Sequence, residues 1–249
     1  MYDSDPSVEQ RRIWSDEQLE LRKRLELTDR LDFTLDNLHY VGGVDLSFPL
    51  GDHENAVACL VVMTFPDLQV VYKKFLETKL YLPYISGYLA FREVNPLMNL
   101  LNELKTNQPE IYPQILLIDG NGLLHPRQFG IACHLGVVSD TPTIGVAKNF
   151  LMIRGDLDDV NKIKATCHET LWKRGDRLDL IGETSGILYG TALRTGSKNP
   201  VFVSQGHRVS LETAVKIVLA VSPRYRIPEP IRMADLESRA YIRENWKYK

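Results

Sequence analysis

The chain has 249 residues, enough for one domain with a substantial core, and its 44% hydrophobic and 25% charged content is typical of globular proteins. A formal net charge of −2 excludes a polycation that binds nucleic acid by bulk attraction, so phosphate binding would require local basic patches or bound metal. The charged N-terminus lacks a signal core, and no apolar run approaches a membrane span. Three widely spaced cysteines without metal-ligand spacing indicate reduced thiols, so we expect a protein of the cytoplasm, the nucleus or both.

The N-terminal segment, residues 7–30, is dense in charge and predicts an amphipathic helix packed on the outside of the domain. Its charged face is interpreted as solvated and not as a binding surface. The apolar residues that recur at helical spacing are Ile13, Trp14, Leu21 and Leu25.

From residue 40 the pattern becomes that of β-strands. Turn signals at Gly51-Asp52-His53 and Pro66-Asp67 separate three apolar segments, and such short loops require antiparallel neighbours. We expect these strands over residues 41–48, 56–64 and 69–76.

Helices and buried strands alternate in the rest of the chain. A helix is expected over residues 87–105, and Pro96 should bend or split it because proline removes a helical hydrogen bond. Four consecutive apolar residues from Ile115 to Ile118 predict a strand buried on both faces. The further elements expected are a helix over 129–138, a strand over 143–147, a helix around 160–172, strands over 187–193 and 201–204, a helix over 210–221 and a last helix beginning near Ile231.

This order of elements predicts an α/β fold of the ribonuclease H-like type. It consists of a mixed five-stranded sheet (β-β-β-α-β-α-β) with helices on both faces, followed by additional helices and strands. Without repeats or linkers, residues 1–249 form a single domain, with the N-terminal helix within residues 1–35 and the core over residues 40–238. The analogy is one of topology and does not by itself confer function.

Four acidic residues are candidates for a common site. Asp45 interrupts the first strand, and Asp119 ends the central strand, where open α/β sheets place their ligands. Glu93 lies one turn into a helix and Asp235 lies in the last helix. Taken singly, Asp119-Gly is typical of a turn and a helical glutamate is typically solvated.

The predicted topology makes the first and fourth strands neighbours, so Asp45 and Asp119 should be adjacent. Like charges that close cannot all stay ionised without a cation. Carboxylate oxygens suit Mg²⁺, and two such ions could activate a water and stabilise the leaving oxygen of a phosphodiester.

Seven motifs, in order along the chain, resemble those of the endonuclease V family. They extend over the region from about Tyr40 to Ser238, and seven ordered matches do not recur by chance. The motifs are Tyr40–Phe48 (YVGGVDLSF), Pro83–Gly87 (PYISG), Phe91–Glu93 (FRE), Ile118–Arg127 (IDGNGLLHPR), Ile144–Lys148 (IGVAK), Ser204–His207 (SQGH) and Arg226–Pro230 (RIPEP).

The resemblance implies a Mg²⁺-dependent nuclease, with Mn²⁺ also supporting activity, that recognises inosine in single-stranded RNA or DNA. It implies hydrolysis of the second phosphodiester bond 3′ to inosine, leaving 3′-OH and 5′-phosphate ends. Asp235 stands where many bacterial members have His, which favours a eukaryotic-type member and RNA as the main substrate. We expect a monomer without a membrane partner.

The resemblance also assigns roles at the catalytic centre. Asp45, Glu93 and Asp119 match the metal carboxylates, and Asp235 matches a fourth metal position. Lys148 matches a catalytic-site lysine that helps to balance phosphate charge. The last member of this catalytic set is His125, which matches a histidine near the site.

Two further groups of residues match the parts of the family that handle the base. Tyr84 matches a wedge that fills the gap left by the flipped nucleotide, in a loop formed by Pro83, Tyr84, Ile85 and Ser86. Ser86 departs from the commoner Pro-Tyr-Ile-Pro ending. The residues that match the base pocket are Gly87, Leu89, Gly120, Asn121, Gly122, Ile131 and Leu151.

Within that pocket, the segment Gly120–Gly122 can present backbone N–H groups to O6 of hypoxanthine, because glycine has no side chain to hold the base away. For Leu89, Ile131 and Leu151, simple core packing is an equally good explanation.

Three other classes of function share parts of this pattern. A modified-base reader that does not cut would be favoured by loss of a carboxylate, but all four are present. A structure-selective resolvase or ribonuclease H is disfavoured by the Pro-Tyr-Ile loop and the Asp-Gly-Asn-Gly-Leu run. A Rossmann nucleotide enzyme is disfavoured because Gly-Asn-Gly lacks the third glycine.

Overall fold

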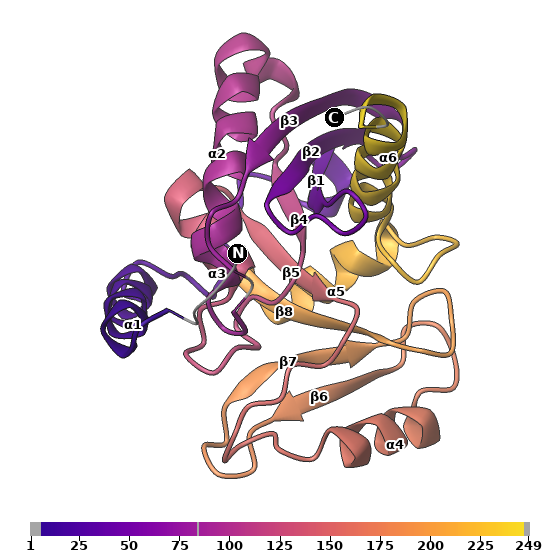
Figure 1. Ribbon diagram of the computed structural model, residues 1–249. Helices are drawn as coiled ribbons and strands as arrows, with labels where there is room; N and C mark the ends of the chain where they lie inside the picture. The colour runs from indigo at the N-terminus through magenta and orange to yellow at the C-terminus, as the bar shows by residue number, and fades with distance from the viewer. Residues whose placement is uncertain (1–5, 84, 247–249) are drawn as a thin grey trace.

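The computed structural model describes residues 6–83 and 85–246 of the chain (Figure 1). In this part of the chain eight strands form one sheet. They are β1 (Tyr40–Ser47), β2 (Asn55–Thr64), β3 (Val70–Lys79), β4 (Ile115–Asp119), β5 (Thr143–Ala147), β6 (Arg177–Ile181), β7 (Leu188–Leu193) and β8 (Val201–His207).

Helices cover both faces of this sheet (Figure 1). Three of them begin at residues whose side chains accept a bond from the first-turn backbone: Ser7, Asp159 and Ser210. The α-helices are α1 (Val8–Arg22), α2 (Leu89–Asn107), α3 (Ile131–Ser139), α4 (Val160–Thr170), α5 (Leu211–Ala220) and α6 (Glu229–Asn245), and the 3₁₀ turns are Leu35–Asn37 and Pro109–Ile111.

The strand order is β3-β2-β1-β4-β5-β8-β7-β6. β1 pairs antiparallel with β2 and β2 with β3, while β1, β4 and β5 run parallel. The predicted ribonuclease H-like mixed sheet is therefore confirmed, and β8, β7 and β6 extend it by three antiparallel strands. The β1–β4 register pairs Val44 with Ile118, so the next residues, Asp45 and Asp119, lie beside each other.

Successive side chains of the central strands point to opposite faces of the sheet, and both faces are apolar. Val44 and Ile118 pack with Leu97 of α2 in one buried cluster. Val41 and Ile231, at the start of α6, belong to the cluster on the other face, which α5 also covers. Burial on both sides makes the ends of β1, β4 and β5 a rigid platform for side chains that leave the sheet.

Gly43 lets α6 lie directly against β1. A Cβ at this position would lie 2.2 Å from the backbone oxygen of Pro230, so no larger residue fits without moving the helix. Further along the same contact, the hydroxyls of Ser47 and Ser238 are hydrogen bonded at 2.7 Å. This close packing fixes Asp235, which lies between these two contacts on α6, over the end of β1.

The structure differs from the expected elements at three places. Pro96 does not split α2, which is continuous through it; the buried face that includes Leu97 and Leu100 holds the helix together across the missing hydrogen bond. The first helix ends at Arg22 and not near residue 30, because the segment after it bonds to the end of β8, with Arg208 N–H donating to Glu26 O at 2.7 Å.

The third is β6, which the sequence analysis did not predict. It is a short edge strand whose only buried residue is Leu180. Its signal was the alternation of Leu178 and Leu180 with charged residues, over too few positions to stand out from the polar segment before it.

None of the helices in residues 6–83 and 85–246 combines the length and apolarity needed to cross a membrane.

In the outer part of the molecule, Asp156 joins the segment before α4 to the β6–β7 turn and to β7. Its carboxylate accepts hydrogen bonds from Ser185 Oγ at 2.5 Å and Ser185 N–H at 3.0 Å, and from Tyr189 Oη at 2.7 Å and Thr184 N–H at 3.0 Å. These bonds lower the pKa of Asp156 to about 2.

We therefore expect Asp156→Asn to lower the melting temperature at pH 7. A depressed carboxyl pKa stabilises the fold above the unfolded value, about 3.9, and this stabilisation disappears as the pH falls towards 2. The variant should lose less stability than the parent between pH 4 and pH 2, as measured by thermal unfolding across that range. Asp16→Asn, at an exposed position on α1, is the control; equal pH dependence of Asp156→Asn and the parent would contradict this role.

Candidate active site

Four elements bring carboxylates to one end of the sheet: Asp45 from β1, Asp119 from β4, Glu93 from α2 and Asp235 from α6. Burial raises the pKa of Asp45 well above its usual value, and the charges of Asp119, Asp235 and Glu93 raise it further. The structure therefore brings all four predicted acidic residues within electrostatic reach of one another.

Glu93 lies in the second turn of α2, which delivers it over the sheet. Burial raises its pKa to about 7; the charge of Arg92 works against this rise, and that of Asp119 adds to it. No hydrogen bond or ion pair holds its carboxylate among the described residues.

Two cations partly balance the acidic cluster. Lys148 directly follows β5, and its Nζ lies 2.5 Å from Asp119 Oδ2. Burial alone lowers the pKa of Lys148, but the charge and hydrogen bond of Asp119 outweigh this and raise it. On α6, Arg239 Nε lies 2.6 Å from Asp235 Oδ1.

The cluster has the donor chemistry of a site for a hard divalent cation. Its members are carboxylate oxygens. Burial and their mutual repulsion raise the pKa of Asp45, and a bound cation would offset that repulsion. In residues 6–83 and 85–246, however, no three His, Cys, Asp or Glu side chains are already close enough to enclose a metal ion. Asp119 and Asp235 each have one carboxylate oxygen paired with a basic side chain, so a bound cation would compete with Lys148 and Arg239 for these carboxylates.

His125 lies beside the loop before α2. Its Nδ1 accepts from Arg127 N–H at 3.2 Å, so its Nε2 carries the proton that is donated to Gly87 O at 3.0 Å. Burial lowers the pKa of His125 to about 4. The ring is therefore neutral near pH 7 and positions the Gly87 loop.

A second feature is a small cavity of about 60 Å³, whose lining includes Asn121, two residues beyond Asp119. Five of the seven residues predicted for the base pocket line it: Gly87, Leu89, Asn121, Ile131 and Leu151. Its other lining residues are Gln18, Ser86, Ala90, His125 and Gly130.

Gly120 and Gly122 do not line this cavity, and their N–H groups are engaged within the protein. Gly122 N–H donates to Ser204 Oγ at 2.9 Å, and Gly120 N–H donates to Val146 O at 3.3 Å. A Cβ on Gly122 would lie 2.0 Å from Gln205 O, so this glycine is required for close packing against β8.

Asn121, between these two glycines, has two polar groups without a hydrogen-bond partner in the described part of the chain, although its carbonyl oxygen accepts from Ala132 N–H. Its side-chain Oδ1 is buried without a hydrogen-bond partner, and its backbone N–H makes no hydrogen bond among the described residues. A buried acceptor without a partner is costly, and such groups are concentrated at ligand sites.

The wedge prediction for Tyr84 lies outside the described residues. Of its neighbours, Pro83 and Ile85 are half-buried, and Ser86 is exposed at the rim of the cavity.

Known proteins share this sequence and this arrangement of residues. A sequence model of the Endonuclease V family matches residues 19–236. The chain belongs to the endonuclease V family. It is 44% identical to human Endonuclease V over 247 residues, covering 96% of this chain and 86% of the human protein. It is 45% identical to the mouse protein, covering 96% and 71% of the two chains.

Solved structures agree with this assignment. The catalytic domain of human Endonuclease V superimposes with a TM-score of 0.92 at 43% identity, covering 98% of this chain and 100% of that one. A single-residue variant of Ciona intestinalis Endonuclease V, solved with a 23mer DNA containing an inosine followed by a ribo-adenosine, superimposes with a TM-score of 0.91 at 40% identity. That match covers 96% of this chain and 99% of the Ciona chain. As an endonuclease V, the protein is a nuclease that hydrolyses phosphodiester bonds.

The sequence analysis did not assign two residues that support the cavity of this endonuclease V. Gln18 of α1 is buried, and its amide donates to Gly87 O at 3.2 Å and Phe129 O at 3.1 Å. Arg127 Nε donates to Gln18 Oε1 at 2.5 Å, and the guanidinium also donates to Gly87 O. A signal for Gln18 was present, because a polar residue four positions after Trp14 stands on the apolar stripe of its helix.

Proposed function

We propose that this endonuclease V cuts single-stranded nucleic acid, RNA in preference to DNA, at the second phosphodiester bond 3′ to an inosine. The observation that carries the proposal is Asn121. Asn121 lines the small cavity, its Oδ1 is buried without a partner, and it lies only two residues beyond Asp119, which supports base recognition next to the site of hydrolysis. The complexes of the Ciona protein with inosine-containing DNA support the choice of base.

Hypoxanthine carries an acceptor at O6 and a donor at N1–H. The free backbone N–H of Asn121 can donate to O6, and its side-chain Oδ1 can accept from N1–H. Adenine would place a donor against the Asn121 N–H and an unprotonated N1 against Oδ1, leaving groups unpaired at about 1–3 kcal/mol each. The small cavity, walled by Leu89 and Ile131, disfavours the extra amino group of guanine.

Such recognition requires the nucleotide to leave its stack, because a stacked base cannot be enclosed. We propose that Tyr84 fills the gap, since stacking of a base on an aromatic ring contributes about 1–3 kcal/mol.

Hydrolysis takes place at the carboxylates. Asp45, Glu93, Asp119 and Asp235 would hold Mg²⁺ or Mn²⁺, which when bound supplies a Lewis acid for phosphate oxygen and lowers the pKa of an attacking water. Lys148 places a positive charge beside Asp119, where it can also pair with the scissile phosphate. His125 and Gln18 hold the Gly87 loop and with it one wall of the base cavity.

The test compares matched single strands of RNA and DNA that carry inosine, adenosine or guanosine at one position, each with Mg²⁺ or with a chelator. We expect cleavage of the inosine strands alone, only with metal, one nucleotide beyond inosine and faster for RNA. Binding of inosine strands without any cutting in Mg²⁺ or Mn²⁺ would instead support a modified-base reader, and cutting of all strands alike would contradict base recognition.

A further inference from the structure

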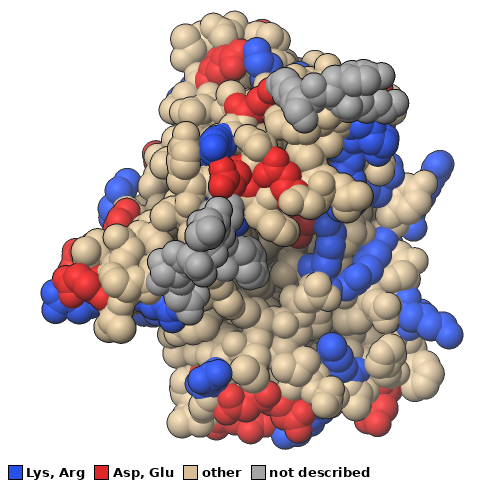
Figure 2. Space-filling model, in the orientation of Figure 1, with Lys and Arg blue, Asp and Glu red and all other residues tan. Residues whose placement is uncertain are grey.

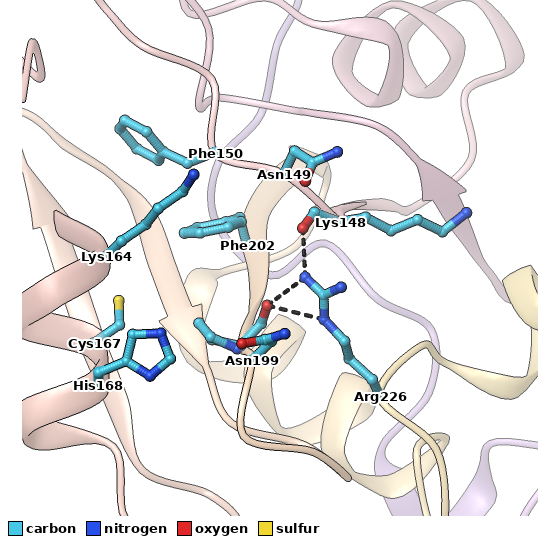
Figure 3. Close-up of a pocket in the computed structure, with 10 residues that line it drawn as sticks. Lys148, Asn149, Phe150, Lys164, Cys167, His168, Asn199, Phe202 and Arg226 are labelled. Atoms are coloured by element: carbon cyan, nitrogen blue, oxygen red, sulfur yellow. Dashed lines mark hydrogen bonds between the residues drawn. The ribbon is translucent and has the colours of Figure 1, made fainter. Parts of the chain in front are cut away.

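A second, larger cavity of about 440 Å³ (Figure 3) has Lys148, the partner of Asp119, among its lining residues. It is walled by the segment after β5, by α4 and by the start of β8. Its lining residues are Lys148, Asn149, Phe150, Lys164, Cys167, His168, Asn199, Pro200, Phe202 and Arg226. Leu151, the next residue after this segment, lines the base cavity, so a single short loop separates the two.

The lining of this cavity is basic although the whole chain has a net charge of −2. Lys164 extends from α4 into the space, and Arg226 enters from the opposite wall (Figure 3). Among the described residues neither has a carboxylate partner. Arg226 donates only to backbone oxygens, with its Nε 3.2 Å from Pro200 O, and it also bonds to Lys148 O. No Asp or Glu lines the cavity, so its charge is available to an anion.

An aromatic surface stands beside these cations. The ring centroids of Phe150 and Phe202 are 5.5 Å apart at an interplanar angle of 57°. Phe202 is buried, whereas Phe150 is only half-buried and offers a ring face at the cavity. A positive groove with an aromatic platform is the combination that binds single-stranded nucleic acid without reading its sequence.

Lys148 connects this cavity to the reaction site. Its backbone carbonyl accepts the hydrogen bond from Arg226 at the cavity wall (Figure 3). Its ammonium lies 2.5 Å from Asp119 Oδ2. The face drawn in Figure 2 shows the same contrast, with Asp and Glu above a central hollow and Lys and Arg on its right-hand side. A strand that crosses the carboxylates from the base cavity therefore continues towards Arg226 and Lys164.

We propose that this cavity is the subsite for the first nucleotide beyond the scissile bond, an assignment that rests on the proposed function. The base of that nucleotide lies against Phe150, and its 3′ phosphate is held by Lys164 and Arg226. Inosine occupies the small cavity, the scissile phosphate lies at the carboxylates, and the downstream strand is bound by charge and stacking without sequence preference.

Two inosine strands test this subsite. One ends in a 3′-OH on the first nucleotide beyond the cut and so lacks the phosphate in question; the other continues for five more nucleotides. We expect the parent to show a lower KM for the long strand. Lys164→Ala should raise that KM by ~5- to 10-fold, as for loss of one phosphate contact, and leave kcat and the short strand unchanged.

Lys162→Ala is the matched control, because Lys162 lies on the same helix but pairs with Glu183 at 2.8 Å, away from the cavity. Equal effects of Lys164→Ala on both strands, or none on either, would overturn the subsite while leaving inosine cleavage intact.

If the parent cuts neither strand, the proposed function fails. Binding of a single strand then tests whether the cavity is a nucleic-acid site. The probe is then a labelled, 5′-phosphorylated, inosine-free hexanucleotide, measured by fluorescence anisotropy without metal. Weaker binding by Lys164→Ala than by the parent and Lys162→Ala supports the cavity as a strand-binding site, and equal binding by all three refutes it.

Discussion

Asp45→Asn is expected to abolish strand cleavage and, in metal-free protein, to raise the melting temperature. The loss of activity should be ~10³-fold or more, as when a preorganised electrostatic group is removed from a reaction centre. The gain in stability follows from the raised pKa of Asp45, which is caused by burial and by the charges of Asp119 and Asp235. Its ionised form destabilises the folded state at neutral pH, and asparagine removes that charge.

The pH dependence of stability provides a second measurement. A carboxyl whose pKa is higher in the folded than in the unfolded state costs stability as the pH rises between the two values. For Glu93 this interval runs from its usual value of 4.5 to about 7. The melting temperature of the metal-free parent should therefore fall across this interval, and Glu93→Gln should reduce that fall.

Bound metal should offset the stability that is lost through the ionised carboxylates. A cation that binds only the folded state stabilises it by mass action, so Mg²⁺ should raise the melting temperature of the parent. Asp45→Asn should respond much less. Near-parental cleavage by Asp45→Asn in Mg²⁺, or an equal stabilisation of both proteins by the metal, would show that Asp45 is not part of a metal site.

The placement of these carboxylates could be predicted because it depends on backbone topology. Short turns made β1, β2 and β3 antiparallel neighbours, and the buried run from Ile115 to Ile118 supplied a central strand. Asp45 and Asp119 then had to meet, since β1 and β4 are adjacent in this order of elements. These steps require only local patterns and the rules of sheet packing.

The support of the base cavity could not be predicted in this way. Gln18 and Gly87 are 69 residues apart, and their hydrogen bond depends on how α1 docks on the domain. The glycines beside Asn121 illustrate the same difficulty. A glycine needed for a turn and one needed for close packing look alike in a sequence, and only the distance of 2.0 Å from a Cβ on Gly122 to Gln205 O distinguishes them.

For this reason Gly122 is a poor probe of base recognition, and Asn121 is the informative position. Asn121→Ala should lower kcat/KM for inosine strands by about 5- to 150-fold, because loss of one buried hydrogen-bonding group costs about 1–3 kcal/mol and 1.4 kcal/mol corresponds to a factor of ten. The preference for inosine over adenosine should fall with it. Asn102→Ala, at an exposed asparagine on α2, is the control and should behave as the parent.

Stability separates recognition from a structural role. The Oδ1 of Asn121 is buried without a partner, so its removal should leave the melting temperature unchanged or slightly higher. The rise in melting temperature with Mg²⁺ should also persist, because the carboxylates are untouched. A large fall in melting temperature would indicate that Asn121 holds the loop after β4, and parental activity with unchanged preference for inosine would remove it from base recognition altogether.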